Sequence, residues 1–303
     1  MKYITFKRKG GEQRAGWLDG DFVIDMYEAS EGELPADLLA FIVKHEDYSS
    51  LIEKLNALEN PLGKYPLSEV RLLAPIPRPV SIRDFYAFED HVKTARARRG
   101  LEVVPEWYEF PVFYFTNHLA IKGPDDIISV PDQCQSLDYE LEIACIIGKE
   151  GKDISAEDAD SYIFGYCIMN DWSARDLQAK EMKVGLGPAK GKDFATSLGP
   201  AIITKDELEA YKKDGKYNIT MKASVNGKLL SEGNFQQIYY SFNKMIERAS
   251  AGVTLYPGEV IGSGTVGTGC ILELGTETHR WLESGDKVEL EITGLGSLVN
   301  TIK

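Results

Sequence analysis

The sequence lacks the features that mark membrane-spanning, secreted and nucleic-acid-binding proteins. No apolar run in its 303 residues approaches about 18 residues, so we expect no membrane span and no membrane partner. The first residues, MKYITFKRKG, contain neither a long apolar core nor a small-residue cleavage site, so we expect no secretory signal. Lys and Arg number 34 against 47 Asp and Glu, and the net charge of −13 argues against nucleic acid as a partner.

Cysteine is also scarce, and no two cysteines form a CxxC pair. Three of the four lie beside apolar residues typical of strands, as in YELEIACIIG and YIFGYCIMN. The histidines do not stand at zinc-ligand spacings, so we expect no zinc site. We expect buried free thiols in a reducing cytoplasm, which is the location we predict for the protein. The cysteines are Cys134, Cys145, Cys167 and Cys270.

The pattern of apolar residues predicts two units, residues 1–71 and 72–303. In the first, strand-like runs (KYITFKR and AGWLDGDFVIDM) precede amphipathic helices (ADLLAFIVKH and SLIEKLNALE), which indicates a small α/β domain. The prolines of RLLAPIPRPVSI favour extended chain, so we place the boundary near Leu72. The second unit has many short strands with glycine-containing turns and few helices, so the sequence predicts an α+β fold whose larger domain is mixed and mainly β.

The second unit has clear candidates for individual elements. The expected strands are PVFYFT, SLDYELEIACIIG, YIFGYCIMN, GPAIIT, NITMKASVNG, EVIGSGT, CILEL and DKVELEITGLG. Asn226 and Gly227 give the strongest hairpin signal, because both residues tolerate the left-handed backbone of a two-residue turn. The expected helices are DFYAFEDHVKTARARR, SARDLQAKEM and SFNKMIERAS.

The segment LDYELEIA, residues 137–144, alternates between polar and apolar residues. In a strand this pattern puts Asp138, Glu140 and Glu142 on one face. Two interpretations are open. The segment is either a half-exposed strand with a solvated acidic face, or it presents neighbouring carboxylates to a divalent cation that removes their repulsion.

The apolar run YIFGYCIMN leads directly into Asp171, and a helix is expected to follow. Ser173 is a candidate N-cap for that helix, with Asp176 three residues further on as in a capping box. Arg175 and Gln178 would lie on one helical face. These polar groups are either the surface of a capped helix or part of a functional site.

The glycine-rich stretch VGLGPAKGKDFATSLGP is not a phosphate-binding P-loop. Leu186 stands where that motif has glycine, and Asp193 stands where it has Ser or Thr. The stretch is therefore a loop that positions Lys192 and Thr196.

Upstream, a helical spacing would put Asp84 and His91 two turns apart on one side of a helix. The basic run KTARARRG follows His91 and stands out in an acidic protein. It is either a solvated helix face or a lid that meets an anionic substrate. Its basic residues are Lys93, Arg96, Arg98 and Arg99.

Together these strings resemble the fumarylacetoacetate hydrolase family. The matching strings are RDFYAFEDH, LDYELEIA, MNDWSARDLQ, LGPAKGKDFATS, SGT and LEL, between residues 83 and 274. The resemblance covers the second unit, whereas the first 70 residues are similar only in forming a small N-terminal unit. It implies a β-roll catalytic domain, a homodimer, and an enzyme that hydrolyses carbon–carbon bonds of ketonic substances in aromatic catabolism.

The resemblance also implies a divalent ion, Mg²⁺ or else Ca²⁺ or Mn²⁺, with Lys192 and Thr196 close to it. Its implied ligands are Asp84, Glu140, Glu142 and Asp171, an all-oxygen set that suits a hard cation. His91 would be the general base on water, oriented by Glu273, and Lys192 with Gln178 would stabilise the oxyanion. The implied substrate contacts are Tyr86, Tyr114, Arg175, Gln178 and Thr265.

The resulting prediction is a metal-dependent hydrolase that cleaves a C–C bond in a small anionic β-diketo acid, of the fumarylacetoacetate or acylpyruvate type, through a metal-bound enolate. The alternatives on the same site are oxaloacetate decarboxylase, hydratase and keto–enol isomerase, since the same scaffold serves each. The pair of His91 and Glu273 favours hydrolysis, because it would activate water. Met182 stands where fumarylacetoacetate hydrolases have a substrate-binding tyrosine, so the sequence leaves the exact substrate open.

Overall fold

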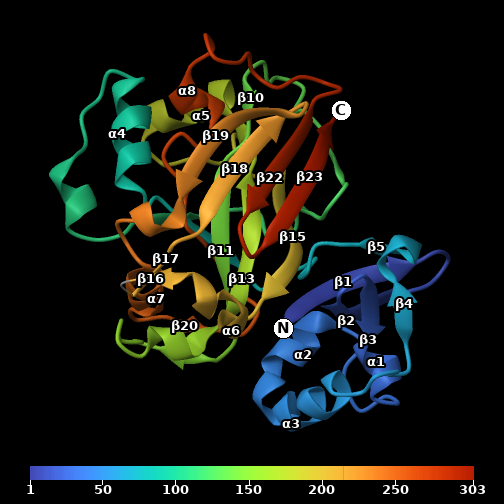
Figure 1. The fold of residues 1–303 in the computed structure, drawn as a ribbon. Coiled ribbons are helices and arrows are strands. Elements are labelled where there is room, and N and C mark those ends of the chain that lie inside the picture. Colours follow the sequence, from blue (N-terminus) through green and yellow to red (C-terminus); the bar gives the residue numbers. More distant parts are fainter. Residues whose placement is uncertain (214) are drawn as a thin grey trace.

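The structure, a computed structural model, describes residues 1–213 and 215–303, and its largest element is a twelve-stranded sheet (Figure 1). The strand order is β4-β3-β2-β1-β15-β13-β11-β21-β6-β7, with β5 beside β1 and β8 beside β15. The first strands are β1 (Lys2–Arg8), β2 (Gln13–Asp19), β3 (Phe22–Asp25), β4 (Lys64–Pro66) and β5 (Val70–Leu72). β1 pairs antiparallel with β15, with Tyr3 opposite Ile202. The two units expected from the sequence therefore share one sheet, and their boundary near Leu72 stays a prediction.

The central strands of this sheet are buried along almost their whole length. They are β11 (Leu141–Ile147), β13 (Ile163–Asp171) and β15 (Thr196–Ile203). Their near-continuous apolar runs suit strands that are covered on both faces. A second sheet contacts them through β18, β22 and β23, and Figure 1 shows it lying across them. The large sheet continues through β21 (Val260–Gly262), β6 (Ile82–Phe85) and β7 (Phe113–Phe115).

The second sheet has the order β19-β18-β22-β23-β9. Its strands are β18 (Thr220–Val225), β19 (Lys228–Asn234), β22 (Lys287–Ile292), β23 (Gly296–Ile302) and β9 (Ile127–Ile128). Asn226 and Gly227 join β18 to β19 with φ angles of 52° and 78°. Such left-handed values are those of a type I′ hairpin turn, so the predicted hairpin is confirmed. Two sheets with few helices also confirm the α+β fold class.

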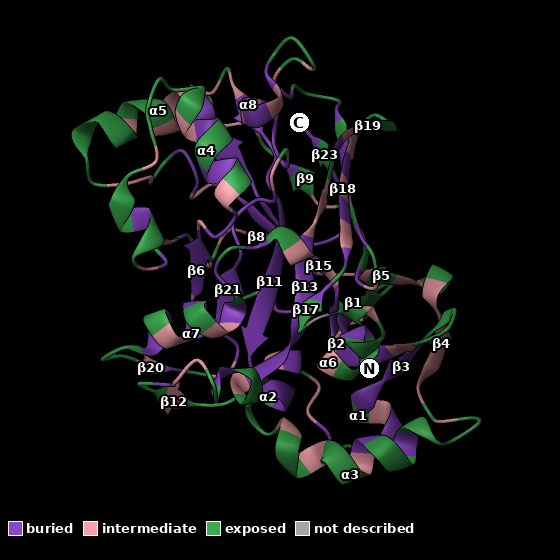
Figure 2. Cartoon of the chain, turned by 60° about the vertical axis from the view of Figure 1, so that its left-hand side comes forward, coloured by how far each residue is buried: buried purple, intermediate pink, exposed green. Residues whose placement is uncertain are grey.

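Most of the helices lie at the ends of the sheets. α2 (Leu38–Val43) and α3 (His45–Asn56) belong to the N-terminal part. α4 (Glu89–Ala97), α5 (Arg175–Val184) and α8 (Ile271–Leu274) gather at one end of the large sheet, and α7 (Phe242–Ser250) lies toward the other (Figure 1). Figure 2 shows that exposed residues concentrate on the helices and loops, whereas β11 and β13 are buried. Among the described residues, no helix has the length and apolarity needed to cross a membrane.

The remaining elements are short. They are α1 (Met26–Ala29), α6 (Lys205–Leu208), β8 (Ile121–Lys122), β10 (Leu137–Asp138), β12 (Gly151–Lys152), β14 (Ser173–Ala174), β16 (Lys212–Lys213), β17 (Lys216–Tyr217) and β20 (Thr254–Leu255). The cysteines are free thiols; three are buried, and Cys134 is half-buried.

The segment CILEL forms helix α8 instead of the predicted strand. The carboxylate of Asp138 accepts hydrogen bonds from the backbone N–H groups of Ile271 (2.8 Å) and Leu272 (3.0 Å). N–H groups at the start of a helix have no partner within the helix. Here their partner stands 133 and 134 positions upstream, so no local pattern in CILEL could reveal the helix.

Candidate active site

A cavity of about 320 Å³ lies where α4, α5 and α8 meet β6 and β7. Most of the residues predicted to form a site line it, although they come from distant parts of the chain. These are Asp84, Tyr86, His91, Tyr114, Glu140, Arg175, Gln178, Lys192 and Thr265. Glu142 and Asp171 belong to the same acidic cluster as two of these residues, and Glu273 is bonded to His91.

Four carboxylates form a buried cluster at this cavity. Oxygens of the four residues lie within 4.8 Å of one another. None of the four residues is more than 6% exposed, and Glu142 and Asp171 are fully buried. The solvated acidic strand face is therefore the wrong interpretation of residues 137–144, because the carboxylates of Glu140 and Glu142 face a common point inside the protein. The cluster consists of Asp84, Glu140, Glu142 and Asp171.

The cluster has the donor atoms and the free acceptor positions that a hard divalent cation requires. Glu142 Oε1 and Asp171 Oδ1 are buried and have no hydrogen-bond partner in the described part of the chain. Buried carboxylate oxygens without a partner are unfavourable, and oxygen is the ligand that Mg²⁺ and Ca²⁺ prefer. These residues therefore fit a divalent cation. Thr196 lies opposite Asp171 in the β13–β15 ladder, and its buried hydroxyl also has no partner among the residues that the structure describes.

Lys192 is the cation closest to the cluster. Its Nζ donates to Glu140 Oε2 at 2.7 Å and to Asp171 Oδ2 at 2.5 Å. Burial opposes its charge, but Asp171 and Glu140 outweigh burial and raise the pKa of Lys192 above its ordinary value. A protonated ammonium has no lone pair for a metal, so we interpret Lys192 as a charge partner of the cluster. Tyr114 adds a hydroxyl that donates to Asp171 Oδ2 at 2.6 Å.

The surroundings shift the pKa values of the four carboxylates differently. Burial raises the pKa values of Asp84 and Glu142 well above the ordinary range, and the neighbouring carboxylates raise them further. Burial would also raise the pKa of Glu140, but Lys192 and Arg175 outweigh it and lower that pKa. Burial also raises the pKa of Asp171, although Lys192 opposes that shift. A bound cation would relieve the repulsion, which is largest at Asp84 and Glu142.

Gly264, in the SGT string, completes the support of the cluster. Its N–H lies 3.1 Å from Glu142 Oε2 and 3.3 Å from Asp84 Oδ1, and it donates to both. Its φ is +74°, and a Cβ at this position would lie 2.5 Å from the carbonyl oxygen of Phe85. Only glycine therefore suits this close approach. Gly264 is thus a functional residue that the SGT string alone did not reveal.

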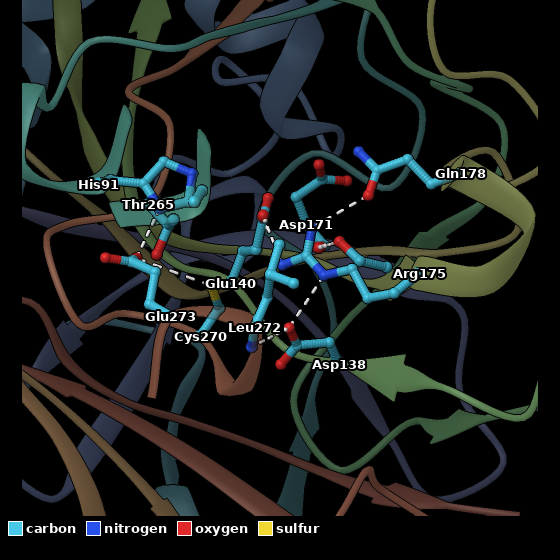
Figure 3. A network of polar contacts seen from close by, with 12 residues as sticks. His91, Asp138, Glu140, Asp171, Arg175, Gln178, Thr265, Cys270, Leu272 and Glu273 are labelled. Carbon is cyan, nitrogen blue, oxygen red and sulfur yellow. Dashed lines mark hydrogen bonds and ion pairs between the residues drawn. The ribbon is translucent and has the colours of Figure 1, made fainter. Parts of the chain in front are cut away.

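His91 and Glu273 form a hydrogen-bonded pair at the edge of the cavity (Figure 3). His91 Nδ1 lies 2.5 Å from Glu273 Oε1, and Glu273 Oε2 accepts from the N–H of Thr268 at 3.0 Å. The ring of Tyr86 meets the imidazole edge to face, with centroids 5.1 Å apart. Asp84 and His91 do not share a helix as predicted, because Asp84 ends up in β6 and α4 begins only at Glu89.

α5 begins at Arg175, and its N-cap is Ala174 instead of the predicted Ser173. Ser173 belongs to β14, which pairs with β10, and its hydroxyl donates to the carbonyl of Asp171 at 3.0 Å. Pairing with β10 therefore removes Ser173 from the capping position. Arg175 Nη1 donates to Gln178 Oε1 at 3.1 Å, so the predicted common face is confirmed.

Arg175 connects the cavity to a carboxylate that the sequence analysis did not assign to the site. Its Nη2 donates to Glu140 at 2.8 Å, and its Nε donates to Asp138 at 2.9 Å. Asp138 is fully buried. The alternation of residues 137–144 had put Asp138 on the acidic face, but spacing alone could not show that its partners would be Arg175 and α8.

The remaining predicted residues complete the cavity wall. Thr265 donates its hydroxyl to the carbonyl of Leu141 at 3.2 Å. The Tyr86 hydroxyl is buried without a partner in the described residues, and burial raises its pKa to about 12. Met182, the residue that departs from the family pattern, also lines the cavity.

The basic run after His91 divides between two environments. Arg96 and Arg99 line the cavity. Arg98 Nε donates to the carbonyl of Glu273 at 3.3 Å, and Lys93 pairs with Glu89 on the same helix. The run is thus more than a solvated face, and two of its arginines can meet an anionic ligand.

Comparison with known proteins agrees with this geometry. Residues 81–303 match the family described as fumarylacetoacetate (FAA) hydrolase C-terminal. The mitochondrial oxaloacetate tautomerase FAHD2B of Bos taurus is 34% identical over 290 residues, which cover 94% of this chain and 85% of that protein. The oxaloacetate tautomerase YisK of Bacillus subtilis (strain 168) is 30% identical over 299 residues, which cover 94% of each chain.

A solved structure shows the same fold. The fumarylacetoacetate hydrolase from psychrophilic Exiguobacterium antarcticum is 28% identical, with a TM-score of 0.76. The match covers 100% of this chain and 99% of that chain, so it includes the N-terminal strands as well as the sheets around the cavity.

Proposed function

The chain belongs to the fumarylacetoacetate hydrolase family, and on that premise we propose that it interconverts the keto and enol forms of a small β-keto dicarboxylate of the oxaloacetate class. The observation that carries the proposal is the pair of His91 and Glu273 facing the carboxylate cluster across one small cavity. His91, which can accept and donate a proton, thus lies close to a carboxylate cluster whose bound cation would contact the oxygens of a substrate. Two relatives that align over 94% of the chain are named oxaloacetate tautomerases.

His91 would carry the proton. Its Nδ1 is hydrogen-bonded to the carboxylate of Glu273, which can only accept. In the neutral imidazole the proton is therefore on Nδ1, and Nε2 keeps its lone pair. Nε2 would take a proton from the carbon next to the keto group. The C–H electron pair would form the C=C bond, and the keto oxygen would receive the proton. The enol product is therefore an isomer of the keto substrate.

The carboxylate cluster would hold the cation that assists this proton transfer. Asp84, Glu140, Glu142 and Asp171 would hold a divalent cation such as Mg²⁺, which acts as a Lewis acid on substrate oxygens when it is bound. Lys192 and Gln178 line the same cavity and would stabilise negative charge on the keto oxygen.

The arginines of α4 would select a diacid. Arg96 and Arg99 line the cavity together with His91, and guanidinium groups bind carboxylates in a bidentate manner. A cavity of about 320 Å³ suits a compact substrate. These features favour a short dicarboxylate over a bulky or neutral ketone.

The second candidate is hydrolysis of a C–C bond in an acylpyruvate or fumarylacetoacetate-type acid, which the sequence analysis had put first. The pair of His91 and Glu273 suits this reaction too. It would remove a proton from water, whose oxygen would bond to the distal carbonyl carbon while the C–C bond breaks and the leaving carbon is protonated. The fumarylacetoacetate hydrolase from Exiguobacterium antarcticum supports this candidate.

An assay with Mg²⁺ on enol-oxaloacetate and on a set of acylpyruvates separates the candidates. For tautomerisation, the enol absorbance should decay faster than in buffer, with no release of CO₂. A free acid released from an acylpyruvate would favour hydrolysis, and CO₂ from oxaloacetate would favour decarboxylation. No acceleration with any substrate would contradict the proposal. Glu142→Gln serves as the control for contaminating activity.

A homodimer and a cytoplasmic location remain predictions. Light scattering on the eluted protein should give twice the mass of one chain. A single-chain mass at assay concentration would contradict the dimer.

A further inference from the structure

Asp138 lies behind the wall of the cavity, where it contacts both Arg175 and the start of α8. Its Oδ1 accepts from the N–H of Ile271 at 2.8 Å, and its Oδ2 accepts from the N–H of Leu272 at 3.0 Å. Oδ2 also accepts from Arg175 Nε at 2.9 Å (Figure 3). The side chain is fully buried, and both of its oxygens accept hydrogen bonds from the protein.

These contacts join two groups with different tasks. On one side, Arg175 donates to Glu140 of the acidic cluster. On the other side, Asp138 accepts from the N–H groups of the first two residues of α8, a helix of only four residues that carries Glu273. A helix of one turn is unstable on its own, because its nucleation is unfavourable. The carboxylate of Asp138 therefore fixes where α8 starts and, through it, where Glu273 meets His91.

We propose that Asp138 is a positioning residue for proton transfer: it holds α8 so that Glu273 orients His91, in register with the Arg175–Glu140 side of the cavity. The inference rests on the proposed function, because it takes His91 as the group that moves the proton. Asp138 does not line the cavity, so its effect on the reaction would pass through Glu273 and Arg175.

The chemistry of the site explains why a carboxylate is needed. An ionised carboxylate only accepts hydrogen bonds, and Asp138 meets three donors. In Asp138→Asn, one oxygen would be replaced by an amide NH₂ that faces a donor. At least one contact with α8 or Arg175 would then be lost, with little change in volume. Groups that orient a catalytic ligand typically affect activity by about 10–100-fold.

A double-mutant cycle with Glu273→Gln tests the route of this effect. Asp138→Asn should lower kcat about 10–100-fold in the wild-type background, with KM changed less than about 3-fold. In the Glu273→Gln background the same change should lower kcat less than about 3-fold, because residues that act as a unit are not additive. An equal factor in both backgrounds would overturn the proposal, since Asp138 would then act independently of Glu273.

A second readout does not depend on turnover. The proton that His91 Nδ1 donates to Glu273 should give a downfield NMR signal in the metal-free protein. Asp138→Asn should shift or abolish this signal. An unchanged signal, with His91→Ala identifying it, would overturn the proposal. If the wild type acts on no substrate, the proposed function fails, while this measurement still decides the role of Asp138.

Asp25 provides the matched control. It is a buried aspartate that caps the four-residue helix α1 far from the cavity. Asp25→Ala should lower the unfolding temperature, because it removes the cap, and leave kcat and the NMR signal unchanged in both backgrounds. If it lowers kcat as Asp138→Asn does, the effect of Asp138 is general destabilisation and the proposal is wrong.

A second variant covers the case in which Asp138→Asn does not fold. Ile271→Pro removes one donor to Asp138 and keeps the carboxylate. Proline is compatible with the first position of a helix, and Cys270 before it is extended, with φ −152° and ψ 160°. This variant should also shift the His91 signal and lower kcat less in the Glu273→Gln background. Failure of both effects would overturn the proposal.

Discussion

Asp25 and Asp138 have the same local task in two regions of the molecule. Each is a buried aspartate whose carboxylate accepts backbone N–H groups at the start of a four-residue helix. Asp25 accepts from Tyr27 and Glu28 at 3.0 and 3.1 Å, and an arginine, Arg14, lies 3.8 Å away. In both cases burial raises the pKa of the carboxyl despite these partners.

The two regions differ in what the carboxylate connects. The donors to Asp25 are its next neighbours in the chain, so the contact stabilises only α1 and the adjacent strands. Asp138 joins segments more than 130 residues apart, and its helix carries Glu273. Identical capping chemistry therefore affects stability in the N-terminal part and, in our proposal, reactivity at the cavity.

Among the proposed substitutions, removal of a carboxylate from the acidic cluster should have the largest effect on activity. Glu142→Gln should abolish Mg²⁺ binding, measured by titration calorimetry, and the activity that depends on it. The metal-free variant should be at least as stable as the wild type at neutral pH. Burial and neighbouring carboxylates raise the pKa of Glu142, so its ionisation opposes folding above the ordinary pKa. Wild-type Mg²⁺ affinity in this variant would contradict the metal site.

The next largest effect is expected from the proton-transferring group. His91→Ala should lower kcat by roughly 10²–10⁴-fold, the range typical of a general acid or base. Mg²⁺ affinity should change less than about 3-fold, because the imidazole is not part of the oxygen cluster. Parallel steady-state kinetics and calorimetry measure both quantities. A near wild-type rate would exclude His91 as the group that moves the proton.

A smaller effect, on stability alone, is expected in the N-terminal part. Asp25→Ala should lower the free energy of unfolding by about 0.5–2 kcal/mol, as expected for the loss of a helix cap. Its kcat and Mg²⁺ affinity should equal those of the wild type. Denaturant unfolding followed by circular dichroism measures the loss. A change in kcat would remove the distinction between Asp25 and Asp138.

The smallest effect concerns pH and uses a third buried aspartate. Burial opposes the charge of Asp286, but bonds from Arg280 (2.7 and 3.0 Å), the N–H of Glu283 and Asn226 lower its pKa to about 2. Its contribution to stability should be complete above pH 4 and be lost as the pH falls toward 2.

Asp25 should behave with the opposite sign. Its raised pKa means that its contribution is largest at low pH and declines as the pH rises above its ordinary value. Unfolding midpoints of Asp286→Asn, Asp25→Asn and the metal-free wild type across this range measure both slopes. Equal slopes for the two variants would contradict the assignment.

Local patterns in the sequence predicted much of the framework. The apolar runs predicted the central strands, and the Asn226-Gly227 pair predicted its hairpin, because both signals depend on neighbouring residues. The candidate site residues came from short strings that resemble a family, and the structure brings these residues together at one cavity.

The features that the sequence did not predict depend on contacts between residues far apart in the chain. Alternation at residues 137–144 could not distinguish solvent from a buried cluster, since both place polar groups on one side of a strand. The start of α8 depends on Asp138, and the position of Ser173 depends on pairing with β10. Likewise, the packing of α4 decides which arginines of the basic run reach the cavity, and the spacing of these arginines in the sequence does not predict that packing.

The junction between β1 and β15 has a consequence for how the chain reaches its fold. Lys2 and Tyr3 pair with Ile203 and Ile202, about 200 residues later in the sequence. On the ribosome, β1 is therefore made long before this partner, and its unpaired edge is a template for pairing with other chains. Closing so long a loop is also slow. We expect the first residues of β1 to dock late, and misassembly in concentrated refolding mixtures to begin at this edge.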